Sequence, residues 1–227
     1  MGLDMYLYRA PLVGDITANQ IVVLDSYFDW LRSKAEGDKY ANRSFEQWCG
    51  HSEDEIEEIG EDTISILKDA VHTRYYVWDT DKEYPNMSIY DEVAYWRKAN
   101  QVHKWFVDHV QDGVDDCANY EVTQEQLEDL LAACVTIKVN THLKKAKIQN
   151  GLTFKDGKPV PIMEDGKIIA NPEIAQRLLP TTGGFFFGSE EYDQYYMDDI
   201  DETIKQLTDI LHNTDFEKEI VFYHSSW

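Results

Sequence analysis

Alternating polar and apolar positions mark both ends of the chain as strands. Residues 3–9 read Leu-Asp-Met-Tyr-Leu-Tyr-Arg, so successive side chains fall on opposite faces of an extended backbone. Residues 220–223 follow a similar pattern. Two such strands can lie side by side, which would hold both chain ends to the core. The pattern therefore predicts a small antiparallel sheet that joins the termini.

Helical spacing of apolar residues dominates the interior of the chain. Thr17 with Gln20, and Thr123 with Gln126, form the capping-box pattern that begins many helices. Apolar residues then recur three and four positions apart after each box. We expect one helix near residues 18–35 and another after the second box.

Several shorter elements follow from local signals. The sequence predicts a helix through residues 64–70, a short strand at 75–78, a loop over 79–86 and a short helix at 172–179. A serine cap followed by two glutamates favours the start of a final long helix at Ser189.

The apolar spacing also predicts a helix over residues 92–111. On that helix Asn100 and His103 would fall on the apolar side, while Arg97 and Lys104 would lie about a quarter turn away. A buried amide and imidazole each need hydrogen-bond partners. This helix therefore either anchors an internal polar network or helps to line a pocket.

The composition changes over residues 138–171, which become basic and β-prone. Asp156-Gly157 and Asp165-Gly166 separate short segments of this region, and Asp-Gly is a strong hairpin signal. We interpret the region as a β-meander inserted into a helical body.

Length and composition indicate one globular domain, residues 1–227. Apolar residues make up 43% of the 227 positions, which is enough for one sizeable core. With the elements above, this predicts an α+β fold that is mainly helical. Three widely separated cysteines favour a reducing cytoplasm, and no apolar run is long enough to span a bilayer.

The formal net charge of −22 limits the classes of partner. Such a surface repels nucleic-acid backbones, so direct nucleic-acid binding is disfavoured. The same surface could instead dock on a basic groove of another protein, including one built for nucleic acid. Solubility alone is the simpler interpretation of the charge.

Residues 95–106 concentrate cationic side chains in this acidic chain. Arg97, Lys98, Asn100, His103 and Lys104 could bind a small anionic ligand, with Trp96 and Trp105 as stacking surfaces. Alternatively, the cations pair with nearby surface carboxylates. A histidine on an apolar helix face is more often a satisfied core residue than a ligand or base.

A glycine-rich loop forms the second candidate element. Gly183, Gly184 and Phe186 precede the predicted final helix, where free backbone amides could hold an anion. The lysine and spacing of a P-loop are missing, so a tight turn around a core of three phenylalanines is the competing interpretation. We expect this loop to form one wall of the same pocket, and the C-terminal Trp227 to be packed and to line that pocket as well.

Catalytic and metal motifs are weak. There is no GxSxG and no HExxH spacing, so we expect neither a nucleophile triad nor a metal site, and no cofactor. The open enzymatic alternative is a reaction on a phosphorylated or nucleotide substrate, with His103 as general acid or base and Arg97 and Lys104 holding the developing charge.

Five motifs together resemble a widespread family of small phage and prophage proteins of unknown function. Members of that family open with a GLDMYL-like strand, carry YWRKANxxHKWF, an Asp-Asp-Cys turn and LPTxxGFFFG, and close on SSW. The matching segments here are residues 2–7, 95–106, 115–117, 179–188 and 225–227. Residues 138–171 depart from the compact members, which supports their interpretation as an insertion.

The resemblance implies a phage origin and the host cytoplasm, and it assigns no reaction. The hypothesis we carry forward is a non-catalytic binding protein that holds a small anionic or nucleotide-like ligand or inhibits a basic host protein. The enzyme described above and an acidic mimic of nucleic acid stay open as alternatives.

Overall fold

The computed structural model describes residues 2–77, 83–184 and 186–227, and within them the fold is α+β. The helices are α1 (Ala18–Glu36), α2 (Phe45–Cys49), α3 (Glu53–Glu57), α4 (Glu61–Asp69), α5 (Asn100–His109), α6 (Gln124–Asn140), α7 (Glu173–Leu178) and α8 (Gln194–Asn213). The strands are β1 (Asp4–Pro11), β2 (His72–Val77), β3 (Glu83–Ser88), β4 (Asp91–Arg97), β5 (Tyr120–Glu121), β6 (Leu143–Lys155), β7 (Lys158–Ile169) and β8 (Glu219–Ser226).

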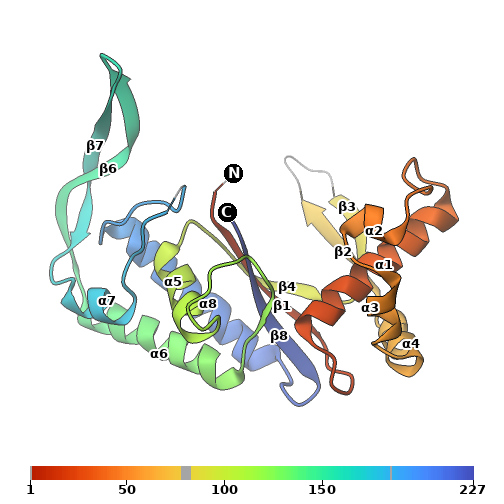
Figure 1. Ribbon diagram of the computed structural model, residues 1–227. Helices are drawn as coiled ribbons and strands as arrows, with labels where there is room; N and C mark the ends of the chain where they lie inside the picture. The colour runs from red at the N-terminus through yellow and green to blue at the C-terminus, as the bar shows by residue number, and fades with distance from the viewer. Residues whose placement is uncertain (1, 78–82, 185) are drawn as a thin grey trace.

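A four-stranded antiparallel sheet lies at the centre, in the order β4-β1-β8-β5 (Figure 1). The terminal strands β1 and β8 pair from Asp4 opposite Ser226 to Pro11 opposite Glu219. On the other edge of β1 lies β4, a strand that the sequence pattern had assigned to a helix. The sheet is therefore larger than the two terminal strands suggested.

The two faces of the sheet support two separate apolar clusters. Along the first strand, Leu3, Met5 and Leu7 face a cluster formed with α5, α6, α7 and α8. The alternate positions Tyr8 and Ala10 face a second cluster formed with α1 to α4. Figure 1 shows the two groups of helices on opposite sides of the sheet. The period of two in the sequence thus separates the two clusters.

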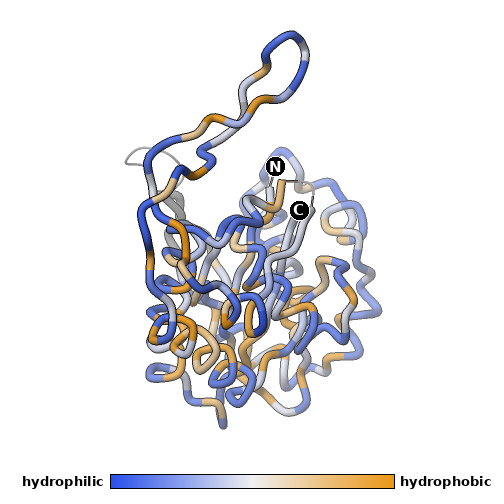
Figure 2. Tube along the Cα trace, turned by 90° about the vertical axis from the view of Figure 1, so that its left-hand side faces the viewer, coloured by the Kyte–Doolittle hydropathy of each residue, from blue (hydrophilic) through white to orange (hydrophobic). Residues whose placement is uncertain are grey.

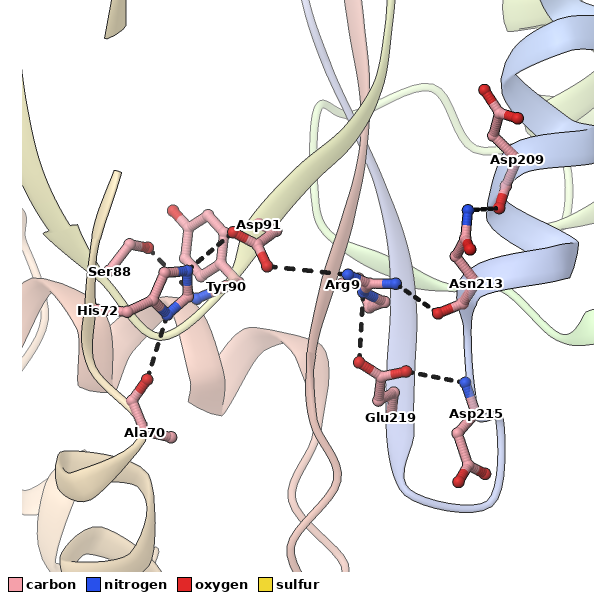
Figure 3. Close-up of polar contacts among 10 residues, drawn as sticks. All are labelled: Arg9, Ala70, His72, Ser88, Tyr90, Asp91, Asp209, Asn213, Asp215 and Glu219. Carbon is pink, nitrogen blue, oxygen red and sulfur yellow. Dashed lines mark hydrogen bonds and ion pairs between the residues drawn. The ribbon is translucent and has the colours of Figure 1, made fainter. Parts of the chain in front are cut away.

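Arg9 holds one end of the sheet together (Figure 3). Its guanidinium lies 3.3 Å from Glu219 of β8 and 3.9 Å from Asp91 of β4, and it donates to the Asn213 carbonyl at 2.9 Å. Asp91 in turn lies 2.8 Å from the ring of His72 at the start of β2. Each of these cationic or imidazole groups has its partners inside the fold.

Several helix boundaries confirm the capping signals. Both capping boxes form, at Thr17 and at Thr123. The prediction that the last helix begins at Ser189 is wrong, because α8 begins at Gln194. Asp193 is the cap, and its carboxylate accepts the backbone amides of residues 195 and 196.

The predicted helix over residues 92–111 is also wrong in its first half. That half is strand β4, and the chain turns at Lys98, which has a φ of 61°, before α5 begins. Ala94 and Trp96 are buried while Tyr95 and Arg97 are exposed, which is the alternation of a strand. Both a helix and a strand at this position would bury Trp96, so the sequence pattern does not distinguish a helix from a strand here.

Residues 143–169 form a single long hairpin rather than the expected meander. Strands β6 and β7 turn at Asp156-Gly157, whereas Asp165-Gly166 lies inside β7. A Cβ at position 166 would lie 2.4 Å from the Ile148 side chain, so glycine is needed there for close packing and not for a turn. We call residues 143–169 the arm, because the hairpin projects from the body (Figures 1 and 2).

A second hairpin follows α4. The strand expected at residues 75–78 is part of β2, although Trp78 and residues 79–82 lie outside the described residues. The loop expected over 79–86 is wrong at its end, because β3 already begins at Glu83 and pairs with β2.

Candidate functional site

The cationic segment divides at Lys98 into two environments. Before it, Arg97 ends strand β4 with 60% of its side chain exposed. The Lys98 amide donates to the Leu3 carbonyl at 2.8 Å, and its carbonyl accepts from the Asn100 amide at 2.9 Å, so the chain passes from sheet to helix within two residues. Gly188 has a φ of 100° and packs on this turn, where a Cβ would lie 2.8 Å from the Lys98 carbonyl oxygen.

A cleft of about 790 Å³ opens beside Arg97 and Lys98. It lies where the end of β4, the arm, the loop before α8 and the first turns of α8 meet. Its lining consists of Arg97, Lys98, Gln101, Gln149, Asn150, Gly151, Phe186, Gly188, Ser189, Glu190, Glu191, Asp193, Tyr195, Tyr196 and Asp199. Two cations thus lie in the same cleft as four carboxylates, and the lining is polar for a small-molecule site.

Asp199 is the most perturbed acid of the cleft. Burial raises the pKa of its carboxyl to about 6, the Gln101 amide that donates to it at 2.9 Å opposes that rise, and the nearby Asp198 and Asp193 add to it. Asp199 therefore gains and loses a proton close to neutral pH, and it can present either a carboxylate or a carboxylic acid to a ligand.

Aromatic surfaces and the arm complete the cleft. Phe186 and Tyr195 both line it and are both exposed. The Tyr195 hydroxyl donates to Glu164 of β7 at 2.9 Å, and Glu164 also accepts from the Asn150 amide of β6 at 2.8 Å. Glu164 therefore links the arm to α8 at the edge of the cleft.

The second environment is a buried network around His103, whose side chain is 1% exposed. Its Nε2 lies 3.0 Å from a carboxylate oxygen of Asp115, and its Nδ1 lies 2.8 Å from the Tyr223 hydroxyl. A neutral ring that donates from Nε2 to the carboxylate and accepts from the hydroxyl satisfies every group. His103 does not line the cleft.

Asn100 and Trp96 are also engaged inside the fold. The Asn100 amide donates to the carbonyls of Phe187 and Ser189 at 3.2 and 2.8 Å, and its oxygen accepts from the Thr182 amide at 2.9 Å. The Trp96 indole donates to the buried hydroxyl of α8 at position 203, at 2.9 Å. The Asn100 side chain therefore holds the start of α5 against the glycine-rich loop.

The other predicted site residues lie apart from the cleft lining. Lys104 pairs with Asp108 at 2.8 Å on the surface of α5. Trp227 is 54% exposed rather than fully packed. Its indole donates to Asp115 at 3.0 Å, and its ring meets Phe187 edge-on with the ring centres 6.0 Å apart.

Two glycines of the glycine-rich loop pack closely against side chains that follow a few residues later. A Cβ at Gly183 would lie 2.7 Å from the Glu190 carboxylate, and one at Gly184 would lie 2.5 Å from the Phe187 ring. These glycines therefore permit internal packing, and no anion is needed to explain them. Of the three phenylalanines, Phe187 is buried, Phe186 is exposed in the cleft and Phe185 lies outside the described residues.

The sequence motifs thus meet, but around the buried network, and the cleft lies beside them. Of the residues that the sequence analysis named for ligand binding, Arg97, Lys98 and Phe186 line it. The sequence analysis missed Gln101 and Asp199 as lining residues. A usable signal was the spacing of Tyr195 and Asp199, which are four positions apart on α8 and so share one helix face.

Metal sites and membrane spans are two further kinds of functional feature. In residues 2–77, 83–184 and 186–227, no three His, Cys, Asp or Glu side chains gather in a way that could hold a metal ion. Across the same part of the chain, none of the helices combines the length and apolar character that crossing a bilayer requires.

Comparison with known proteins gives no further assignment. No family model matches the chain, and neither a curated protein nor a solved structure matches it.

Proposed function

We propose that the chain is a phage- or prophage-encoded binding protein that acts in the host cytoplasm and holds a small nucleotide-like anion in the cleft beside Arg97. The phage origin rests on the sequence motifs. The observation that carries the ligand class is the pair of exposed cations at a cleft of about 790 Å³, a volume in the range of small-molecule sites.

The two arginines of the sheet support this use of Arg97. The side chain of Arg9 is 22% exposed and is held by a carboxylate at 3.3 Å and a carbonyl at 2.9 Å. The side chain of Arg97 is 60% exposed, and its nearest carboxylate, on Asp4, lies 4.0 Å away. Arg97 can therefore turn its planar fork to a phosphate or carboxylate without breaking a close ion pair.

Lys98 adds a second positive charge to the cleft beside Arg97. It is exposed, and within the described part of the chain its side chain forms no salt bridge. Arg97 and Lys98 are adjacent in sequence on either side of the strand end. Together they supply two positive charges to one anionic group.

The remaining lining suits a polar, flat group. Phe186 and Tyr195 offer aromatic surfaces for stacking, and Asp199 and Gln101 offer hydrogen-bond acceptors and donors. Carboxylates also line the cleft at positions 190, 191 and 193, so an extended polyanion would be repelled. A nucleoside monophosphate combines one anionic group with a ring that carries donors, and it fits this division of charge.

The enzymatic alternative gains no support at His103. Both ring nitrogens already have partners, and the ring is buried away from the cleft lining. A general acid or base must come within hydrogen-bond reach of its substrate. Mimicry of nucleic acid stays an alternative that rests on net charge alone.

Thermal unfolding with added ligands tests the proposal. Inorganic phosphate and the four ribonucleoside 5′-monophosphates are the probes. A ligand at one hundred times its Kd stabilises the folded state by about 2.7 kcal/mol, which corresponds to a rise in Tm of roughly 5–10 °C for a chain of this length. We expect this rise in the native chain and in Lys104→Ala, and its loss in Arg97→Ala.

Lys104→Ala is the control for Arg97→Ala because the two cations differ in position. Lys104 is a cation of the same motif that lies outside the cleft lining and pairs with Asp108. If no probe raises the Tm, or if Lys104→Ala removes the rise as fully as Arg97→Ala does, the cleft is not an anion site.

A further inference from the structure

The arm presents apolar side chains to solvent on both of its faces. Phe154, 74% exposed, lies opposite Pro159 and shares one face with it, whereas the exposed Val160, the next residue of β7, points to the other face. Ile162 and Met163 are exposed as well. A two-stranded hairpin is marginally stable at best in water. A surface that covers these side chains would therefore stabilise the arm.

The charge of the arm is opposite to that of the rest of the chain. The arm contains six lysines and three carboxylates, which gives a net charge of +3 and leaves −25 on the remaining residues of a chain with −22 in total. Two lysine pairs lie directly across the strands, Lys155 opposite Lys158 at the tip and Lys145 opposite Lys167 near the base. Like charges in that position destabilise a sheet, so an acidic partner would relieve both pairs.

The edges of the arm are poorly suited to strand addition. Pro159 and Pro161 in β7 have no amide hydrogen to donate, and lysines recur along β6. Both features hinder edge-to-edge pairing of strands. Contact through the faces and the charged tip fits the arm better.

A groove of matching chemistry lies at the other end of the body. It has a volume of about 430 Å³, and its lining includes Leu12, Asp15, Glu121, Val122, Phe216 and Ile220. Leu12, Val122, Phe216 and Ile220 are apolar, and the charged members of the lining are carboxylates. Figure 1 shows the loop that follows β1 and the loop that precedes β8 here, at the bottom of the view, far from the tip of the arm at the top.

We propose that the arm tip of one copy of this chain binds in the groove of a second copy. Phe154 enters the apolar floor of the groove, and Lys155 and Lys158 lie against the carboxylates of Asp15 and Glu121. Because arm and groove lie at opposite ends of the body, two inverted copies side by side make the contact twice and close a two-fold symmetric dimer.

Sedimentation of the full-length chain at low and high salt tests the dimer. We expect a dimer at about 50 mM salt that weakens at about 500 mM, because the contact includes charge pairs. Phe154→Asp is expected to give a monomer at both. Val139→Asp is the matched control, since Val139 is 75% exposed on α6, outside the arm and the groove, and we expect it to dimerise like the native chain. A cooperative unfolding transition and a native-like circular dichroism spectrum in each variant confirm folding.

A charge exchange tests the pairing of arm with groove. Lys158→Glu and Asp15→Lys are each expected to weaken the dimer by at least tenfold in Kd. An equal mixture of the two variants is expected to restore association, because each of the two contacts then joins opposite charges.

Three outcomes would overturn the proposal. They are a native chain that is monomeric at low salt, a dimer that survives Phe154→Asp, and a mixture of the charge variants that stays monomeric. A monomeric chain that binds duplex DNA or RNA through the arm lysines would assign the arm to a nucleic acid instead.

Discussion

The buried network around His103 and the cleft beside Arg97 share one segment of twelve residues, 95–106. They differ in whether the fold supplies partners for their polar side chains. In the network every named group has a close internal partner, and His103 is 1% exposed. In the cleft, Arg97 and Lys98 are left to solvent. A polar group that costs free energy when unpaired tends to be satisfied by the fold, whereas recognition requires groups that the fold leaves available. Under the proposed function, the cation-rich segment 95–106 is therefore divided between a structural part and a ligand-binding part.

The largest effect is expected at the network. His103→Ala leaves the Asp115 carboxylate and the Tyr223 hydroxyl without their imidazole partner and opens a cavity in the core. We expect the free energy of unfolding to fall by about 3–5 kcal/mol. Urea denaturation measures it. At a temperature where the variant is folded, its affinity for a nucleoside monophosphate should equal that of the native chain, and a selective loss of affinity would move His103 into the site.

The next effect is expected at the cleft and on binding rather than stability. Arg97→Ala should weaken the binding of a nucleoside monophosphate by about 1.5–3 kcal/mol, which is a factor of ten or more in Kd, because a charged fork is lost. Its free energy of unfolding should change by less than about 0.5 kcal/mol, since the ion pair of Arg97 with Asp4 is long, at 4.0 Å, and the arginine side chain is 60% exposed. Calorimetric titration and urea denaturation separate the two quantities. If Arg97→Ala lost as much free energy of unfolding as free energy of binding, the contrast between the buried network and the cleft would be contradicted.

Asp199 gives a pH dependence with a defined sign. Its pKa is raised from 3.8 to about 6 in the fold, so between these values the folded state holds more protons than the unfolded state and stability falls as the pH rises. Above pH 6 the ionised, buried carboxylate costs stability in full. Asp199→Asn can still accept from Gln101 and should stabilise the chain at pH 7 by roughly 1–2 kcal/mol.

The same substitution has little effect at pH 4, because the native carboxyl is then protonated in the fold. Urea denaturation of both chains between pH 4 and pH 7 measures the difference. Curves that stay parallel over this range would show that Asp199 titrates normally.

The smallest effect is expected at Lys104, the cation of the motif that belongs to neither region. Its exposed pair with Asp108 is a single contact four positions apart on a helix. Lys104→Ala should change both the free energy of unfolding and the ligand affinity by less than about 0.5 kcal/mol. A tenfold loss of affinity would extend the site along α5.

Local signals in the sequence predicted elements whose boundaries depend on local chemistry. The capping boxes at Thr17 and Thr123 placed the starts of α1 and α6, and the alternating termini became β1 and β8. These features require only neighbouring residues, so a single sequence is enough to find them. The α+β class followed from them.

Features that depend on tertiary partners were missed. Trp96 is buried under either a strand or a helix periodicity, and only pairing with β1 selects the strand. Ser189 is a good cap in isolation, yet Asp193 caps α8. The cleft needed segments from residues 97 to 199 to converge, and the predicted pocket residues Asn100, His103 and Trp227 meet instead around an internal network.

The division of the cationic segment is tested most directly by an NMR titration of the ¹⁵N-labelled chain with a nucleoside monophosphate. We expect the largest amide shifts at Arg97, Lys98, Gln101, Phe186 and Asp199, with small shifts at Tyr223 and Trp227. Shifts centred on His103, Asp115 and Trp227, or no shift at millimolar ligand, would contradict the assignment of the cleft as the binding site.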